Sequence, residues 1–224
     1  MCRKFIVLFI LLMLMLFLFL VPSVRAVEKS QQGMLSIYFM EEKVGYEEYA
    51  WESDDRGYLL SVKGRITKPI PMRIDQLTLH LDNHFIADQF YFKGSVNGMD
   101  QEISSSITEG RVENTILVAG QERKNTVNIR RDSFLLPNPV FSPYLIITKK
   151  YRCSLKIPEE KLELSAYIIP QLEVPFLLRS KQAQPCCLIM EISGIEIELQ
   201  TDSQGDLKAV FIPSQKLKVI RSRS

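Results

Sequence analysis

Strict alternation of apolar and polar residues is the feature that most constrains the fold of this chain. Residues 195–200 read Ile-Glu-Ile-Glu-Leu-Gln, and the same period of two runs through 34–39, 58–66 and 77–81. Successive side chains of a β-strand point to opposite faces, so this pattern buries its apolar half only when the chain forms strands. The sequence therefore predicts a mainly β protein.

Turn-forming residues separate these alternating runs at short, regular intervals. The sharpest signal is Asn97-Gly98, because Asn-Gly supplies the two positive-φ positions of a type I′ hairpin turn. A long antiparallel meander has to curl or close in order to cover its apolar face and its edges. We therefore expect a curled antiparallel β-sheet or a half-open barrel.

One segment departs from the alternation. Residues 135–143 are apolar and rich in proline, and they lead into the sequence Tyr-Leu-Ile-Ile-Thr-Lys-Lys-Tyr at 144–151. Ser142 suits a helix N-cap and Pro143 suits the first helical position, whereas the β-branched residues 146–148 are weak helix formers. The sequence predicts one short helix near 143–151. It lies in a segment (132–158) between a strand-rich region at 33–131 and another at 160–222, and is placed to act as a lid or a plug.

The N-terminal residues have the pattern of an export signal. Arg3 and Lys4 precede an unbroken apolar run from Phe5 to Val21, and Val24-Arg25-Ala26 resembles a cleavage site with small residues at −3 and −1. We predict a signal peptide at 1–26 and a single β-rich envelope domain at 27–224, exported to the periplasm or the extracellular space. The alternative is an uncleaved anchor, since the apolar run reaches the lower limit for spanning a bilayer; membrane contact would then be confined to residues 5–21.

Charge argues against nucleic acid as a partner. Loss of residues 1–26 would remove three of the 28 Lys and Arg side chains and leave 25 against 26 Asp and Glu. A nearly neutral chain has no general electrostatic attraction for nucleic acid or for an anionic membrane surface. We therefore expect no nucleic-acid partner.

Three cysteines follow the signal segment: Cys153, Cys186 and Cys187. Their spacing contains no C-x-x-C and matches no zinc or redox motif. In an oxidising compartment we expect one disulfide, joining Cys153 to either Cys186 or Cys187. Buried, unpaired cysteines are the alternative.

Only one cluster suggests chemistry. His80, Asp82 and His84 would share a face of a regular strand, and two imidazoles with a carboxylate are competent zinc or iron ligands. However, Asp82-Asn83 predicts a turn, which would separate the three side chains. The chain has no G-x-S-x-G nucleophile elbow, and adjacent carboxylates such as Glu47-Glu48 point to opposite faces and are predicted to be solvated charges. We expect no enzyme and no cofactor, with a metal-dependent enzyme at His80 and His84 as a less favoured hypothesis.

The order of these features resembles a known group of proteins. An exported β-meander is followed by Leu-Pro-Asn-x-Val-Phe-Ser-x-Tyr-Leu at 136–145, and then by strands that end in an acidic-glycine turn and the pattern Leu207…Val210-x-Ile212-Pro213. This arrangement is similar to that of exported bacterial proteins of the lipoprotein-localisation-factor-like superfamily. The resemblance covers most of residues 27–224, and implies a curled sheet closed by helices around an apolar cavity for acyl chains or other lipids. The chain departs from those carriers in having one convincing helix where they have several.

We therefore expect a non-enzymatic exported protein that binds a lipid, an acyl chain or another hydrophobic small molecule on the concave face of a curled sheet. The candidate lining residues are Phe90, Phe92, Phe134, Leu136, Phe141, Tyr144 and Leu145. The alternative is a structural or interaction module of the cell envelope, whose core is filled by its own side chains and which binds an envelope protein partner.

Overall fold

The computed structural model describes residues 30–152, 161–181, 184 and 186–222. In this part of the chain, fifteen strands form one sheet with the order β8-β7-β6-β5-β4-β3-β2-β1-β15-β14-β13-β12-β11-β10-β9. The strands of the first half are β1 (Gln31–Phe39), β2 (Glu42–Ser53), β3 (Gly57–Ile66), β4 (Met72–Asp82), β5 (Ala87–Val96), β6 (Met99–Thr108), β7 (Arg111–Val118) and β8 (Gln121–Asn128). Those of the second half are β9 (Phe134–Pro137), β10 (Leu162–Ile169), β11 (Leu172–Ser180), β12 (Cys187–Ile192), β13 (Ile195–Thr201), β14 (Leu207–Ile212) and β15 (Leu217–Ser222).

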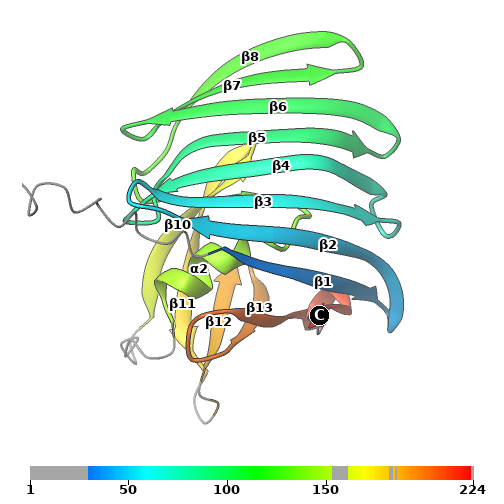
Figure 1. Cartoon of the computed structure of the whole chain (residues 1–224), viewed down its shortest axis with the longest axis vertical. Helices are drawn as coiled ribbons and strands as arrows, with labels where there is room; N and C mark the ends of the chain where they lie inside the picture. Colours follow the sequence, from blue (N-terminus) through cyan, green and yellow to red (C-terminus); the bar gives the residue numbers. More distant parts are fainter. Residues whose placement is uncertain (1–29, 153–160, 182–183, 185, 223–224) are drawn as a thin grey trace, which may run out of the picture.

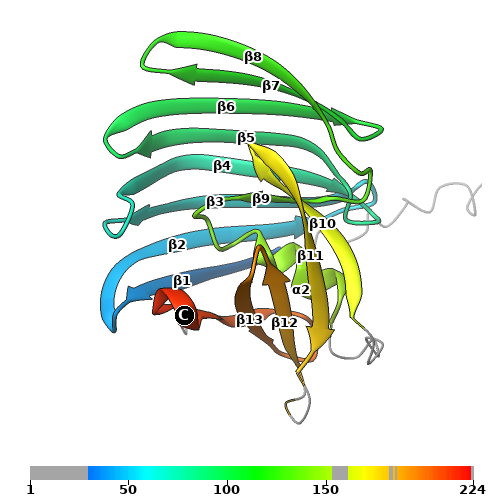
Figure 2. The same ribbon diagram turned by 180° about the vertical axis from the view of Figure 1, so that it is seen from behind.

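The sheet curls without closing. Strands β1 to β8 form a broad layer, and β10 to β13 cross behind it (Figure 1, Figure 2). The two ends of the sheet, β8 and β9, do not pair with each other. Neighbouring strands are antiparallel except β9 and β10, which are parallel. The prediction of a mainly β protein with a curled, half-open sheet is confirmed.

Alternation in the sequence explains which face is inside. Along β4, Leu77, Leu79 and Leu81 are buried while His80 between them is exposed. The same inward period occurs along β3 and β5, so a curled sheet can cover its apolar face with its own second half. One direct link between the two halves is the hydrogen bond from Asn114 Nδ2 on β7 to the Tyr167 hydroxyl on β10, at 2.9 Å.

One α-helix, α2 (Tyr144–Lys150), occurs in the described residues, together with a short 3-10 turn, η1 (Pro213–Gln215). Residues Leu145, Ile146, Ile147 and Thr148 of α2 are all buried, and the helix contacts β9, β13 and β14. Burial on several sides outweighs the weak helix propensity of the β-branched residues. The helix thus fills the curl as a plug. Within the described residues, no helix is long and apolar enough to cross a membrane.

The start of α2 differs from the sequence-based expectation. Pro143 occupies the N-cap position, and no side chain caps the helix. The prediction that Ser142 is the N-cap is wrong, because its hydroxyl bonds to Glu47 instead. At the other end, Lys149 and Lys150 lie in the last turn, where positive charge is favoured by the helix dipole.

Strand β9 lies inside the segment predicted to form the lid. All four of its residues are buried, so it shows no alternation between a wet and a dry face. A short apolar strand of this kind cannot be recognised by periodicity. It forms the parallel edge of the sheet and leads directly into the proline-rich residues before α2.

Candidate ligand-binding cavity

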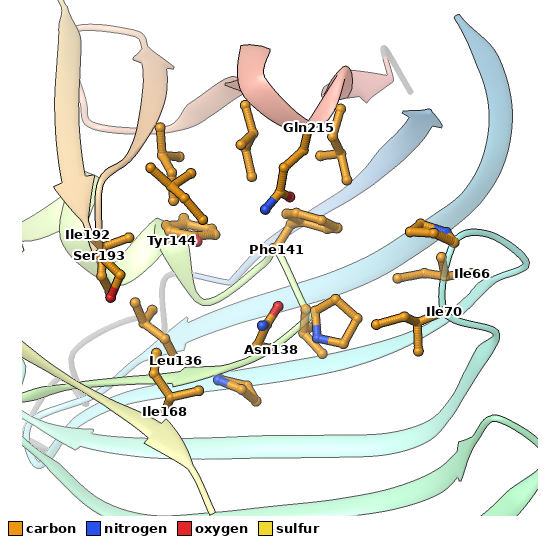
Figure 3. A pocket seen from close by; sticks show the side chains of 18 of the residues that line it. Ile66, Ile70, Leu136, Asn138, Phe141, Tyr144, Ile168, Ile192, Ser193 and Gln215 are labelled. Carbon is orange, nitrogen blue, oxygen red and sulfur yellow. The ribbon is translucent and has the colours of Figure 1, made fainter. Parts of the chain in front are cut away.

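A cavity of about 670 Å³ lies where hairpin turns of both halves of the sheet meet the proline-rich segment. Figure 3 shows Phe141 and Tyr144 near its centre, Ile66 and Ile70 at one side, and Ile192 and Ser193 at the other. The lining residues are Ile37, Phe39, Ile66, Lys68, Pro69, Ile70, Leu136, Pro137, Asn138, Pro139, Val140, Phe141, Tyr144, Ile168, Gln171, Leu172, Val174, Ile192, Ser193, Ile195, Ile197, Ile212, Gln215 and Leu217.

The lining is predominantly aliphatic and aromatic. Its polar side chains include Asn138, Gln171, Ser193 and Gln215, which are exposed and lie toward solvent. The lining cation, Lys68, forms an ion pair with Glu42 at 3.0 Å. Among the described residues that line the cavity there is no Asp, Glu, His or Cys. An apolar pocket with a few polar groups at its mouth is the usual form of a small-molecule site.

The floor of the cavity is the segment from Pro137 to Pro143. Its three prolines carry no backbone N–H, and the N–H of Val140 donates to the carbonyl of Pro137 at 2.8 Å. The N–H groups of Phe141 and Ser142 have no sheet partner, and both donate to the carboxylate of Glu47, at 2.9 and 2.7 Å. The Ser142 hydroxyl donates to the same carboxylate at 2.6 Å. Glu47 therefore satisfies buried donors that the segment cannot satisfy internally.

Burial determines the electrostatics around this carboxylate. Glu47 is fully buried on β2, and burial raises the pKa of its carboxyl, an effect that the hydrogen bonds from Ser142 and Phe141 oppose. Burial also raises the pKa of the Tyr144 phenol, and the negative charge of Glu47 raises it further. Both effects favour a neutral Tyr144 hydroxyl at the cavity wall.

The sequence pattern predicts a solvated Glu47, and this prediction is wrong, because the side chain is fully buried. The alternation along β2 could have indicated this burial. Glu47 lies two and four residues before Tyr49 and Trp51, so the three side chains share one face of the strand, and all three are buried. The β-bulge where β1 pairs with β2 shifts the register near Ile37 and Tyr38, so the inward face of β2 cannot be counted from its first residues.

The far end of α2 is also anchored. The ammonium of Lys149 contacts the carboxylate of Asp206 and donates to Gln31 Oε1 at 3.1 Å. Gln31 in turn donates to Asp206 at 2.7 Å. The helix is thus tied to β2 at its N-terminal side and to β1 and the β13–β14 loop at its C-terminal side, which suits a fixed plug better than a moving lid.

The predicted lining residues divide into two groups. Leu136, Phe141 and Tyr144 line the cavity. The other predicted residues pack in the core and are absent from the lining: Phe90, Phe92, Phe134 and Leu145. For example, Phe134 lies edge-on against Phe176, with 5.9 Å between ring centroids. Ordinary core packing accounts for these four, because each of them is buried within the main hydrophobic core.

The histidine cluster does not assemble. β4 ends at Asp82, and His84 lies in the following turn. The carboxylate of Asp82 accepts backbone N–H bonds from His84 and Ile86, each at 2.8 Å, and both imidazoles are exposed. In the described part of the chain, no three His, Cys, Asp or Glu side chains are grouped as a metal site.

Of the adjacent cysteines, Cys186 is disulfide-bonded and Cys187 is a buried free thiol. Burial, with a smaller contribution from Glu198, raises the pKa of the Cys187 thiol to about 12, so this thiol is poorly reactive. The predicted partner, Cys153, lies outside the described residues, as does the predicted signal peptide.

Comparison with known proteins adds little. No protein-family profile and no curated protein matches the chain. Among solved structures, a DUF1089 family protein from Pseudomonas aeruginosa is similar with a TM-score of 0.44 and 12% sequence identity, over 87% of this chain and 95% of that one. At a TM-score below 0.5 this similarity supports no statement about function.

Proposed function

We propose that the protein is a non-enzymatic binding protein that holds an acyl chain or another apolar small molecule in the cavity described above. The observation that carries the proposal is the cavity itself, about 670 Å³ in size and lined mainly by Ile, Leu, Val, Phe and Pro. Burial of an apolar chain against such a lining is favourable by roughly 25 cal/mol per Å² of apolar surface removed from water.

Ile70 and Leu172 line the cavity and are 42% and 50% exposed, so we place its entrance at these side chains. A ligand that enters there does not have to displace α2, whose two ends are anchored. The exposed amide and hydroxyl side chains at the mouth would contact the polar end of the ligand. A structural module with a filled core is less well supported, since the interior is not filled at this point.

Export remains part of the proposal. The disulfide at Cys186 fits an oxidising compartment, in agreement with the signal sequence predicted at 1–26. The similarity to lipoprotein-localisation factors stays a prediction, and the binding proposal does not depend on it.

The proposal is tested by titrating the protein with a fatty acid that carries a terminal dansyl group, whose fluorescence rises in an apolar site. Replacing Leu172 by Glu places a charge at the mouth, next to where the apolar chain would lie, and a charge beside buried apolar surface is unfavourable. We expect Leu172→Glu to weaken binding by about 10-fold, equivalent to about 1.4 kcal/mol.

Leu117→Glu is the matched control. Leu117 is an exposed leucine at 38%, on β7, and is absent from the cavity lining. It should leave the affinity unchanged. Equal affinities for both variants, or no saturable binding by the unmodified protein, would contradict the proposal.

A further inference from the structure

Three exposed apolar side chains lie in or next to three hairpin turns, at the end of the first layer where the odd-numbered strands finish. Met40 lies in the β1–β2 turn, Ile70 in the β3–β4 loop, and Met99 at the start of β6 after the β5–β6 turn; they are 60%, 42% and 52% exposed. These hairpins lie at the same edge of the layer (Figure 1, right-hand side). We call this set, Met40, Ile70 and Met99, the apolar edge.

Polar contacts hold the three hairpins together. Lys68 pairs with Glu42 at 3.0 Å and joins the first two. The N–H of Asn97 donates to the carbonyl of Pro71 at 2.8 Å, which joins the second and third. The apolar side chains are therefore presented by one connected edge and not by independent loops.

The first turn is unusual in its residues. Met40 and Glu41 have φ values of +50° and +66°, the left-handed region that disfavours side chains with a Cβ by about 1–2 kcal/mol. The β5–β6 turn fills its two positive-φ positions with Asn97 and Gly98, as a type I′ turn favours. A methionine at such a turn tip, 60% exposed, is favoured neither by turn geometry nor by burial.

The charges on this edge have both signs and are intermixed. Besides the Lys68–Glu42 pair, Arg73 pairs with Asp75 at 2.9 Å and with Asp100 at 3.3 Å, and Glu41 and Lys43 follow Met40 closely in the chain. An edge of this kind has no net preference for an anionic or cationic surface, and complements a surface that itself carries balanced charges. Ile70 also lines the cavity, so the apolar edge is continuous with the cavity mouth.

From these observations we infer that the apolar edge docks on a zwitterionic lipid surface. The three side chains enter the boundary between head groups and acyl chains, where apolar tips are buried while polar turns stay hydrated. The cavity mouth then faces the lipid, and an apolar ligand passes between the two without crossing water. The transfer step rests on the proposed function; the docking itself does not.

The test is flotation with phosphatidylcholine vesicles. We expect the unmodified protein to float with the vesicles and Met40→Ser/Met99→Ser to bind them at least 10-fold more weakly. Neither Met40 nor Met99 lines the cavity, so this variant should bind the dansyl fatty acid normally. Met34→Ser/Tyr46→Ser is the control, because these residues are 36% and 39% exposed and lie within β1 and β2, away from the turns. It should float like the unmodified protein.

The outcomes separate docking from ligand binding. If the unmodified protein binds the fatty acid but does not float, the docking inference is overturned and the proposed function stands. Equal flotation of the two double variants also overturns it. If Met40→Ser/Met99→Ser dissociates a dimer of the protein without changing flotation, the edge is an interface between two copies and the inference fails.

The salt dependence of flotation tests the choice of a zwitterionic surface. Flotation should be nearly constant between about 0.05 and 0.5 M NaCl, because paired charges contribute little to attraction that salt can screen. A steep loss in salt would contradict the zwitterionic assignment.

Discussion

Glu47 is the residue on which the cavity floor depends. Its side chain comes from β2 and is fully buried, yet it accepts bonds from two backbone N–H groups and one hydroxyl of residues 141–142. A proline-rich segment has few donors, and those that remain must still be bonded when they are buried. The carboxylate thus allows an irregular apolar segment to lie inside the fold.

Replacing Glu47 by Leu should strongly destabilise the protein. The change leaves three buried donors unbonded, and each unsatisfied buried group costs about 1–3 kcal/mol. We expect the free energy of unfolding in urea to fall by at least about 3 kcal/mol. Glu48→Leu is the matched control, since the adjacent Glu48 is exposed and its replacement should change stability by less than about 0.5 kcal/mol. Similar effects at both positions would contradict the role assigned to Glu47.

The raised pKa of Glu47 predicts a pH dependence of definite sign. Because the folded state holds the proton to higher pH than the unfolded state, the stabilising contribution is fully present below the ordinary value of 4.5 and is lost as the pH rises through the raised value. Relative to Glu47→Gln, which does not titrate, the unmodified protein should lose stability as the pH rises above 4.5. Urea unfolding at several pH values measures this, and a difference that stays constant or grows with pH would be inconsistent with it.

At the scale of elements, α2 is stabilised by its surroundings and not by its own sequence. It is short, and its N-terminus has no side-chain cap. Its C-terminal end packs against Gly205, in the β13–β14 loop, where φ is +81°. A Cβ at position 205 would collide with the carbonyl oxygen of Thr148, so only glycine lets this loop approach the helix.

Gly205→Ala should therefore cost more than the same change at an open turn. Gly120, with φ of +80°, has open space within 4 Å of the position that a Cβ would take, so Gly120→Ala should cost only the conformational penalty of about 1–2 kcal/mol. Gly205→Ala adds a steric conflict worth about 1–3 kcal/mol more. Thermal unfolding of the two variants compares them, and equal losses would show that the loop does not need close contact with α2.

The elements also show what the sequence can and cannot predict. Alternation identified β4 and β13, and Asn97-Gly98 marked its hairpin, because both signals are local. The strand β9 escaped recognition because it is buried on both faces. Ser142 matched the preference of an N-cap, but a buried carboxylate from a strand almost a hundred residues earlier bonded its hydroxyl. Tertiary contacts of this kind leave no trace in the local pattern.

At the scale of the whole molecule, the cavity arises from the way the sheet curls. Its walls come from hairpin turns of β3–β4, β10–β11, β12–β13 and β14–β15, which are distant in sequence. The aromatic residues predicted to line the cavity therefore include core residues, Phe90 and Phe92, as well as part of the site, Phe141 and Tyr144. The aliphatic residues near the turns, such as Ile70 and Ile192, carry no sequence signal that distinguishes them from core residues.

Native mass spectrometry, with lipid extraction, of the protein purified from export-competent cells tests directly whether the cavity holds a ligand. We expect a co-purifying apolar species with a mass typical of an acyl compound, present in the unmodified protein and in Leu117→Glu and depleted in Leu172→Glu. A mass that corresponds to the protein alone, from a sample that unfolds cooperatively and does not bind the dansyl fatty acid, would contradict the assignment of the cavity as a ligand site.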